Sequence, residues 1–215
     1  MKILVFLGSV RESTPPQPPR LGLRVARACA ALLAASGNEV ELIDPLDFDL
    51  DAVFKPHFAY RRSEVPAQLD ELADGIGAAD GYVMVSPEYN HSMSPALAHL
   101  LNHFGSSLFA FKPSAIVTYS AGQWGGTRAA TGMRTFLSEL GCLPVSAMIH
   151  VPKAHEVLAE DGTFNDDAEA WQSWFGRTLG QLEWWAEAAR MGRDHRDPHR
   201  ISPALARTPS QRNAP

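Results

Sequence analysis

Along this chain, short and mostly apolar runs alternate with longer stretches in which apolar residues recur at helical spacing. Runs typical of strands occur at residues 2–7, 39–43, 82–85, 115–119 and 143–151. Stretches typical of helices occur at residues 21–36, 66–79, 95–104, 126–140 and 166–191. Five strands, each followed by a helix, predict a parallel sheet with helices on both faces.

Residues that begin or end helices support these boundaries. Gly37 and Asn38 follow the first helical stretch and Gly141 follows the fourth, as expected at helix C-termini. Ser94 and Pro95 suit the N-cap and the first helical position of the third stretch. We predict an α/β fold with a flavodoxin-like, doubly wound sheet in the order 2-1-3-4-5, because the alternative dinucleotide-binding order has six strands.

The chain has 215 residues, which is enough for one sizeable domain, whereas two domains would be cramped. We assign residues 1–191 to this domain. Residues 192–215 are rich in Arg, Pro, Ser and His and poor in large apolar residues, so we expect a disordered tail. Residues 44–65 form a long irregular connection with aromatic and basic side chains. Its stretch from Phe54 to Tyr60 is either a lid over a substrate or an interface strap.

Charge and cysteine content exclude several classes of function. The net charge is −5, and residues 192–215 hold five of the 19 basic but two of the 24 acidic residues, which leaves residues 1–191 near −8. Such an acidic body argues against nucleic acid as a partner. Cys29 and Cys142 are interpreted as buried thiols, so we expect no disulfide and a cytoplasmic location. No apolar run reaches transmembrane length, so no membrane partner is expected.

Three polar, glycine-containing loops follow the first, third and fourth strands. In the first loop, Gly8 permits a tight turn, Ser9 and Ser13 offer hydroxyls, and Arg11 offers a guanidinium suited to phosphate. The N-terminus of the following helix directs its positive end to the same side. Residues 14–19 are mostly proline, which cannot donate a backbone hydrogen bond, so this insert is not expected to bind phosphate.

The second loop offers groups that suit a planar ligand. It contains Pro87, Glu88, Tyr89 and Asn90, and backbone groups of the last three could meet the hydrogen-bonding edge of a ring. The tyrosine ring could cover part of the face of such a ring. Taken alone, this run also fits a polar turn that caps a helix.

The third loop combines a hydroxyl with backbone that carries no side chains. Ser120 is followed by Gly122, Gly125 and Gly126, and glycine allows backbone to lie close beside a flat ring. In a parallel sheet, ligands bind beyond the carboxyl ends of the strands, where the strand order reverses. Three such loops at one crevice call for a ligand with a phosphate and a flat ring, and FMN has both.

These loops resemble those of the NAD(P)H-dependent FMN reductase family, which includes quinone, azo-dye and chromate reductases. The resemblance runs from residue 2 to about residue 151, and its motifs are Gly8-Ser9-x-Arg11-x-x-Ser13, Ser86-Pro87-Glu88-Tyr89-Asn90-x-Ser92 and Ser120-x-Gly122-x-x-Gly125-Gly126-x-Arg128-Ala129. It implies non-covalent FMN, NADPH or else NADH as hydride donor, and flavin, a quinone or another small molecule as acceptor. It also implies a homodimer or homotetramer with the flavin near the subunit boundary.

From the loops and the resemblance together, we expect FMN contacts from Ser9, Arg11, Ser13, Pro87, Glu88, Tyr89, Asn90, Ser120, Gly122, Gly125 and Gly126. We assign no catalytic residue, because the cofactor carries the chemistry while the protein supplies position and electrostatics. Two alternatives stay open. One is a flavodoxin-type electron carrier without nicotinamide turnover, and the other is a flavin-free interaction domain that keeps only the fold.

Two further patterns invite other interpretations. His99 and His103 have the spacing of a metal pair on one helix, but no third ligand is evident, so we expect no metal and a solvated or interface pair. We expect packing or oligomer contacts from the tryptophans of the last predicted helix, Trp171, Trp174, Trp184 and Trp185.

Overall fold

The structure, a computed structural model, describes residues 1–11, 20–50 and 53–201. Its strands are β1 (Lys2–Leu7), β2 (Glu39–Ile43), β3 (Gly81–Tyr89), β4 (Ser92–Met93), β5 (Pro113–Tyr119) and β6 (Leu143–Val151). Five of them form a parallel sheet in the order β2-β1-β3-β5-β6, and β4 pairs antiparallel with the end of β3. Counted over the parallel strands, this is the predicted flavodoxin-like order 2-1-3-4-5, which is therefore confirmed.

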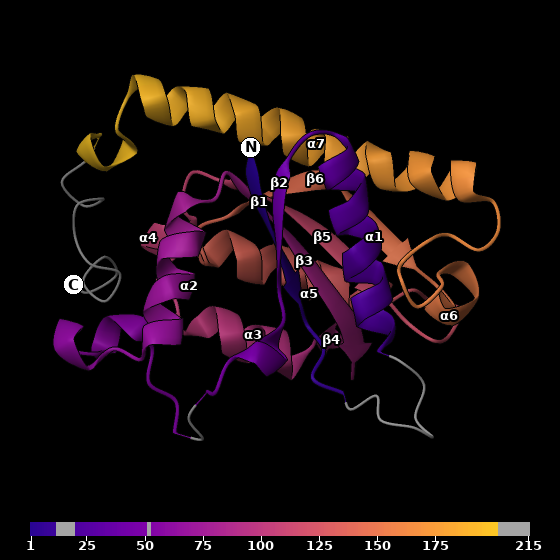
Figure 1. Cartoon of the computed structure of the whole chain (residues 1–215), viewed down its shortest axis with the longest axis horizontal. Helices are drawn as coiled ribbons and strands as arrows, with labels where there is room; N and C mark the ends of the chain where they lie inside the picture. The colour runs from indigo at the N-terminus through magenta and orange to yellow at the C-terminus, as the bar shows by residue number, and fades with distance from the viewer. Residues whose placement is uncertain (12–19, 51–52, 202–215) are drawn as a thin grey trace.

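Helices cover both faces of this sheet (Figure 1). The α-helices are α1 (Leu21–Ala35), α2 (Ala67–Ala78), α3 (Pro95–Asn102), α4 (Ser106–Phe109), α5 (Thr127–Glu139), α6 (Ala154–Val157) and α7 (Ala168–His195). Short 3-10 helices are η1 (Pro45–Asp47), η2 (His57–Ala59), η3 (Arg62–Glu64) and η4 (Pro198–Arg200). All five predicted helices are present, and the described ranges contain no helix that is both long and apolar enough to cross a membrane.

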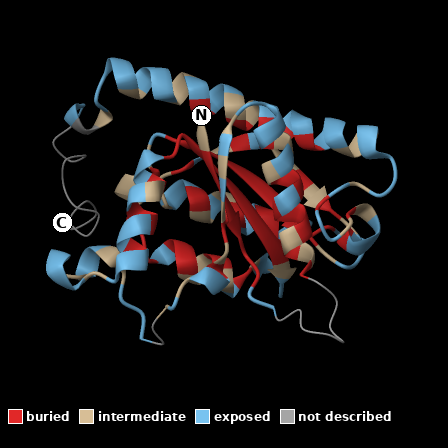
Figure 2. Cartoon of the chain, in the orientation of Figure 1, coloured by how far each residue is buried: buried red, intermediate tan, exposed pale blue. Residues whose placement is uncertain are grey.

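Alternate residues of β1 pack into two separate cores. Ile3, Val5 and Leu7 belong to the core that α1 and α7 cover. Leu4 and Phe6 belong to the core that α2, α3 and α5 cover. Figure 2 shows the strands as the buried centre of the domain, with the helices exposed on their outer sides. A strand buried on both faces must be apolar throughout, which explains the continuous apolar runs in the sequence.

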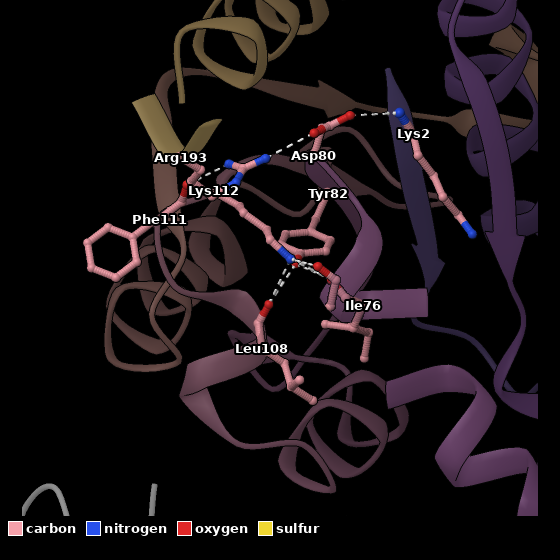
Figure 3. A network of polar contacts seen from close by, with 9 residues as sticks. Lys2, Ile76, Asp80, Tyr82, Leu108, Phe111, Lys112 and Arg193 are labelled. Atoms are coloured by element: carbon pink, nitrogen blue, oxygen red, sulfur yellow. Dashed lines mark hydrogen bonds and ion pairs between the residues drawn. The ribbon is translucent and has the colours of Figure 1, made fainter. Parts of the chain in front are cut away.

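The last helix, α7, is anchored on the amino ends of the strands by its final turn (Figure 3). Arg193 Nη2 lies 2.9 Å from Asp80 Oδ1, and Arg193 Nη1 donates to the Phe111 carbonyl at 3.0 Å. The other Asp80 oxygen accepts a hydrogen bond from the backbone N–H of Lys2 at 3.0 Å. These contacts extend the helix beyond its predicted end at Met191, so the predicted start of the tail falls inside α7. Residues 202–215 lie outside the described residues.

Beside this ion pair, Lys112 is buried with its ammonium group fully engaged (Figure 3). Its Nζ donates to the carbonyls of Ile76, Gly77 and Leu108 at 2.6–3.0 Å. Burial, together with the nearby positive charge of Arg193, lowers the pKa of Lys112 to about 8. This polar network lies at the amino end of the sheet, and the three predicted loops lie at the opposite, carboxyl end.

Candidate functional site

The first loop begins at the end of β1, where its backbone packs closely against the backbone of β3. The backbone N–H of Gly8 donates to the Val85 carbonyl at 2.7 Å, and a Cβ on Gly8 would lie 2.6 Å from that oxygen. Only glycine therefore fits here without a shift of the backbone. Beyond this turn, Ser9 is buried whereas Arg11 is exposed. The loop thus turns its hydroxyl inward and leaves the guanidinium in solvent.

The second loop is partly strand, which corrects its predicted start. β3 runs beyond the predicted end at Val85 because Glu88 and Tyr89 pair with β4. Asn90 and His91 form the tip of this hairpin with φ of 49° and 62°. Positive φ at both positions of a two-residue turn matches the twist of the strands that it joins. The run that looked like a loop in sequence is therefore a short hairpin with a fixed direction.

Polar contacts fasten this hairpin to the starts of α3 and α5. Ser86 Oγ accepts from the backbone N–H of Ser94, the N-cap of α3, at 2.9 Å. The same hydroxyl donates to the Pro87 carbonyl at 2.8 Å. Glu88 directs its carboxylate to the start of α5, where Arg128 Nη2 lies 2.7 Å away. The hairpin is thus preorganised before any ligand binds.

Ser120 organises the third loop through its side chain. Its Oγ accepts from the backbone N–H of Gly125 at 3.0 Å and donates to the Gly122 carbonyl at 2.8 Å. The backbone N–H of Lys153 donates to the Gly122 carbonyl at 2.9 Å, and that of Ala154 to the Ser120 carbonyl at 3.0 Å. The loop therefore folds back on the segment after β6, and the protein itself already engages the Ser120 hydroxyl.

The three glycines of this loop have different surroundings. Gly125 and Gly126 are buried, with φ of 59° and 75°. A Cβ on Gly125 would lie 3.1 Å from Pro152 N, and one on Gly126 would lie 3.0 Å from Thr118 Cβ. A Cβ on Gly122 would have no atom within 4 Å. The first two glycines thus allow the loop to fold, whereas Gly122 stands at its open side.

The loops enclose a cavity of about 490 Å³ at the carboxyl ends of β1, β3 and β5. Six of the predicted site residues line it: Ser9, Arg11, Pro87, Glu88, Tyr89 and Ser120. Asn90, Gly122, Gly125 and Gly126 are not among the lining residues, and Ser13 lies outside the described residues. Each of the three loops thus contributes to one concave site, as expected where a parallel sheet reverses its strand order.

Five further lining residues were not predicted from the sequence: Arg20, Leu21, Tyr119, Ala121 and His155. Tyr119 is the last residue of β5 and Ala121 directly follows Ser120. Both are neighbours of a predicted site residue, so a prediction that included the whole third loop would have found them. His155 lies on the short helix α6, which the sequence did not predict. Arg20 follows the Pro-rich insert, and only the fold brings its side chain back to the first loop.

Hydrogen-bond donors and positive charge gather at the first-loop side of the cavity. Arg11 and Arg20 both line it, and the buried Arg20 forms an ion pair with Asp44. Burial raises the pKa of Tyr119, and a hydrogen bond with Ser9 opposes part of that rise, so the phenol stays protonated near neutral pH. Because Asp44 neutralises Arg20, the exposed Arg11 is the group of this side that suits an anionic ligand such as a phosphate.

Of the histidine pair, His103 is buried and His99 is half-buried, so the predicted solvated position is wrong for His103. The rings of His99 and His103 lie 4.8 Å apart, and the Phe54 ring also lies 4.8 Å from that of His103. His103 is buried, with its Nδ1 2.8 Å from the His99 carbonyl. Phe54, from the 44–65 connection, thus packs against both histidine rings. Within the described ranges, no group of three or more His, Cys, Asp or Glu side chains could hold a metal ion.

Sequence comparison places this chain among flavin-dependent reductases. Residues 1–156 match the family model of NADPH-dependent FMN reductase. A quinone reductase of Escherichia coli K12 is 39% identical over 141 residues, which are 64% of this chain and 69% of that protein. An NADPH azoreductase of Bacillus sp. strain OY1-2 is 32% identical over 94 residues, or 44% of this chain. The match spans 51% of the azoreductase, so it covers about half of that relative.

Solved structures agree on the fold. FerB of Paracoccus denitrificans, a flavoenzyme NAD(P)H:(acceptor) oxidoreductase, has a TM-score of 0.66 at 21% identity over 86% of this chain and 97% of its own. At that identity the likeness concerns the fold alone. The family model, in contrast, covers β1 to β6 and the chain segments that form the cavity. With that match over most of its length, the chain belongs to the NADPH-dependent FMN reductase family.

Proposed function

We propose that the cavity binds FMN and that the protein is an oxidoreductase that takes hydride from NAD(P)H. The observation that carries this proposal is the convergence of three loops on one cavity at the carboxyl ends of β1, β3 and β5. Membership of the family supports the choice of cofactor and donor. The cavity volume of about 490 Å³ suits a small organic ligand, for which pockets of roughly 300–1,000 Å³ are usual.

We assign the phosphate of FMN to the first-loop side of the cavity. Arg11 offers parallel N–H donors that match phosphate oxygens, and Ser9 offers a hydroxyl. The α1 helix begins at Leu21 beside them, and its N-terminus favours a negative charge. Ser13 stays a predicted ligand from the sequence alone.

We assign the flavin ring to the second and third loops. Pro87 and Tyr89 of the second loop and Ala121 of the third line the cavity and give apolar surface for a flat ring. Ser120 lines the same cavity, while Asn90, Gly122, Gly125 and Gly126 contribute by shaping the loops from positions outside the lining. The Glu88 carboxylate is held by Arg128, which orients the hairpin that carries Tyr89.

When bound, FMN supplies the redox chemistry, which is the transfer of two electrons from NAD(P)H to a small acceptor. The protein's part is to bind and orient, and no side chain has to act as an acid or base in the nicotinamide half-reaction. We therefore assign no catalytic residue. We propose NADPH as the preferred donor and a quinone, an azo compound or flavin as the acceptor, in line with the relatives' names.

Purified protein tests this proposal directly. We expect a yellow protein whose bound FMN is bleached by NADPH in the absence of a partner protein, followed by turnover with a quinone. Bleaching without a partner separates this function from that of an electron carrier, which holds FMN but does not oxidise NADPH. A colourless protein with no affinity for added FMN would contradict the proposal and favour a flavin-free interaction domain.

Arg11→Ala tests the orientation of the cofactor. Loss of a charge-assisted hydrogen bond costs roughly 1.5–3 kcal/mol, which is about ten- to a hundredfold in affinity. We expect that loss for FMN but not for riboflavin, which lacks the phosphate. Fluorescence titration of apoprotein with both ligands measures it, and an equal loss for riboflavin would show that Arg11 does not contact phosphate.

We propose a homodimer or homotetramer in the cytoplasm. On α7 the side chains of Trp174, Trp184 and Trp185 are exposed, and large exposed aromatic surface usually marks an interface. Cys29 and Cys142 are buried free thiols, which suits a reducing compartment. Light scattering combined with flavin absorbance during dilution tests the assembly, and a monomer that keeps its FMN at all concentrations would contradict it.

A further inference from the structure

Arg20 connects the first loop to the end of β2 at the edge of the cavity. Its Nη1 and Nη2 lie 2.7 Å and 2.9 Å from the two carboxylate oxygens of Asp44. Nη2 also donates to the backbone carbonyl of Ser9. Arg20 is only 9% exposed and lines the cavity. One buried guanidinium thus ties together the end of β1, the start of α1 and the end of β2.

Asp44 is held firmly enough to serve as an anchor for this guanidinium. It directly follows β2, and its Oδ1 accepts a hydrogen bond from the backbone N–H of Leu46 at 3.0 Å as η1 begins. Its side chain is 14% exposed. A planar guanidinium bound by both carboxylate oxygens has a fixed plane, so the Nη2 that faces Ser9 is fixed as well.

A fixed Ser9 carbonyl sets the geometry of the first loop. In a trans peptide the C=O and the following N–H lie in one plane and point in opposite directions. Holding the Ser9 carbonyl on Arg20 therefore also fixes the direction of the Val10 N–H. Loops that bind phosphate depend on backbone N–H groups held in such fixed directions.

The two arginines of this site differ in charge environment, because Arg20 is paired with a carboxylate and Arg11 is exposed. Asp44 neutralises Arg20, so the pair adds little net charge to the cavity, and the exposed Arg11 is left as the cation for an anionic ligand. We propose that Arg20 is a positioning residue that, held by Asp44, shapes the first loop for the phosphate of FMN. This inference rests on the proposed function, namely that the cavity binds FMN with its phosphate at the first loop.

Arg24, on α1 and four residues beyond Arg20, provides a matched control. Like Arg20 it is 9% exposed, and its Nη1 donates to a backbone carbonyl, that of Leu158, at 2.9 Å. The Nε of each arginine has no hydrogen-bond partner among the described residues, so that feature does not distinguish them. Arg24 is not among the residues that line the cavity, and its hydrogen bond and ion pair within the described residues go to Leu158 and Glu160. Its loss should lower stability without changing which flavin is preferred.

The experiment is fluorescence titration of full-length apoprotein with FMN and with riboflavin, alongside a thermal unfolding midpoint for each variant. We expect Arg20→Ala to weaken FMN binding about tenfold while riboflavin binding changes less than about threefold. Arg24→Ala should lower the midpoint but keep the wild-type ratio of the two affinities. Arg20→Ala can fail to fold because Asp44 is left without its partner. The double variant Arg20→Ala/Asp44→Asn removes both charges, and its ratio of FMN to riboflavin affinity then tests the role of Arg20.

The ratio of the two affinities separates a positioning role from a purely structural one. A wild-type ratio in Arg20→Ala, or in the double variant, would overturn the inference, as would an equal loss in Arg24→Ala. Failure of the proposed function has a different signature, because the wild-type protein itself would then bind FMN no better than riboflavin, or bind neither.

Discussion

Glu88 reaches from the second loop to Arg128, with 2.7 Å between the carboxylate and the guanidinium. The backbone N–H of Arg128, in the first turn of α5, donates to the other carboxylate oxygen at 3.1 Å. The Glu88 side chain is 9% exposed and that of Arg128 is 47% exposed, so the carboxylate is the buried partner. A carboxylate at a helix N-terminus is also favoured by the helix dipole. Glu88 therefore holds the hairpin in place.

Glu88→Ala should weaken FMN and riboflavin binding by the same factor. The hairpin that it holds lies on the side of the cavity that we assign to the flavin ring, so its loosening should affect both flavins alike. Loss of these hydrogen bonds is expected to cost ~1 kcal/mol, or about fivefold in affinity. Titration of both flavins measures it. Glu64→Ala serves as the control, because its ion pair with Arg61 is exposed and lies elsewhere. A loss confined to FMN would contradict this account.

Gly126→Val should destabilise the fold, and Gly122→Val should not. At Gly126 the backbone has φ of 75°, and a Cβ would lie 3.0 Å from Thr118 Cβ. Strain and overpacking together are expected to cost roughly 2–4 kcal/mol. Chemical denaturation of both variants measures the difference. Equal stabilities of the two variants would show that the third loop tolerates a side chain at its buried position.

The sequence was enough to predict the sheet order and the meeting of the three loops at one cavity, because strands buried on both faces are apolar runs and each loop directly follows one. Element ends were less accurate. β3 continues to Tyr89 through a hairpin with β4, and the Asn90-His91 turn lacks the glycine that usually signals such a hairpin in a sequence. Arg20 was missed for a different reason, because its partner Asp44 lies 24 residues away. His103 looked polar in sequence, but Phe54 covers it in the fold.

Arg193→Ala should destabilise the protein although the residue lies near the end of the described chain. If residues 192–215 formed a disordered tail, as their composition predicts, loss of Arg193 would change little. The ion pair between Arg193 and Asp80, with side chains 20% and 12% exposed, leads to the opposite expectation. Leaving Asp80 unpaired is expected to cost about 3 kcal/mol.

Thermal unfolding of Arg193→Ala beside Arg196→Ala checks this. Arg196 is exposed and lies in the same segment, so its variant should behave as wild type. A chain ended after Ile201 keeps Arg193 and should also keep the wild-type midpoint. Identical midpoints for all variants would mean that the ion pair contributes nothing measurable.

The buried Lys112 should make the free energy of unfolding depend on pH. Its pKa falls from 10.5 to about 8 on folding, mainly through burial. Between these two pH values the unfolded chain binds more protons than the folded one, so the free energy of unfolding rises with pH. For one proton the slope approaches about 1.4 kcal/mol per pH unit. Below pH 8 both states carry the proton and this contribution is flat.

Lys112→Met removes this proton, so the gain in stability between pH 8 and 10.5 should be present in the wild type and absent from the variant. Urea denaturation across that range measures the difference between the two proteins, which cancels the titration of all other groups. Lys153→Met, at an exposed lysine, should follow the wild type. If the free energies of unfolding of wild type and Lys112→Met changed in parallel with pH, the prediction would be wrong. The carbonyls of Ile76, Gly77 and Leu108 would then stabilise the ammonium as much as burial destabilises it, and Lys112 would keep the pKa of an ordinary lysine.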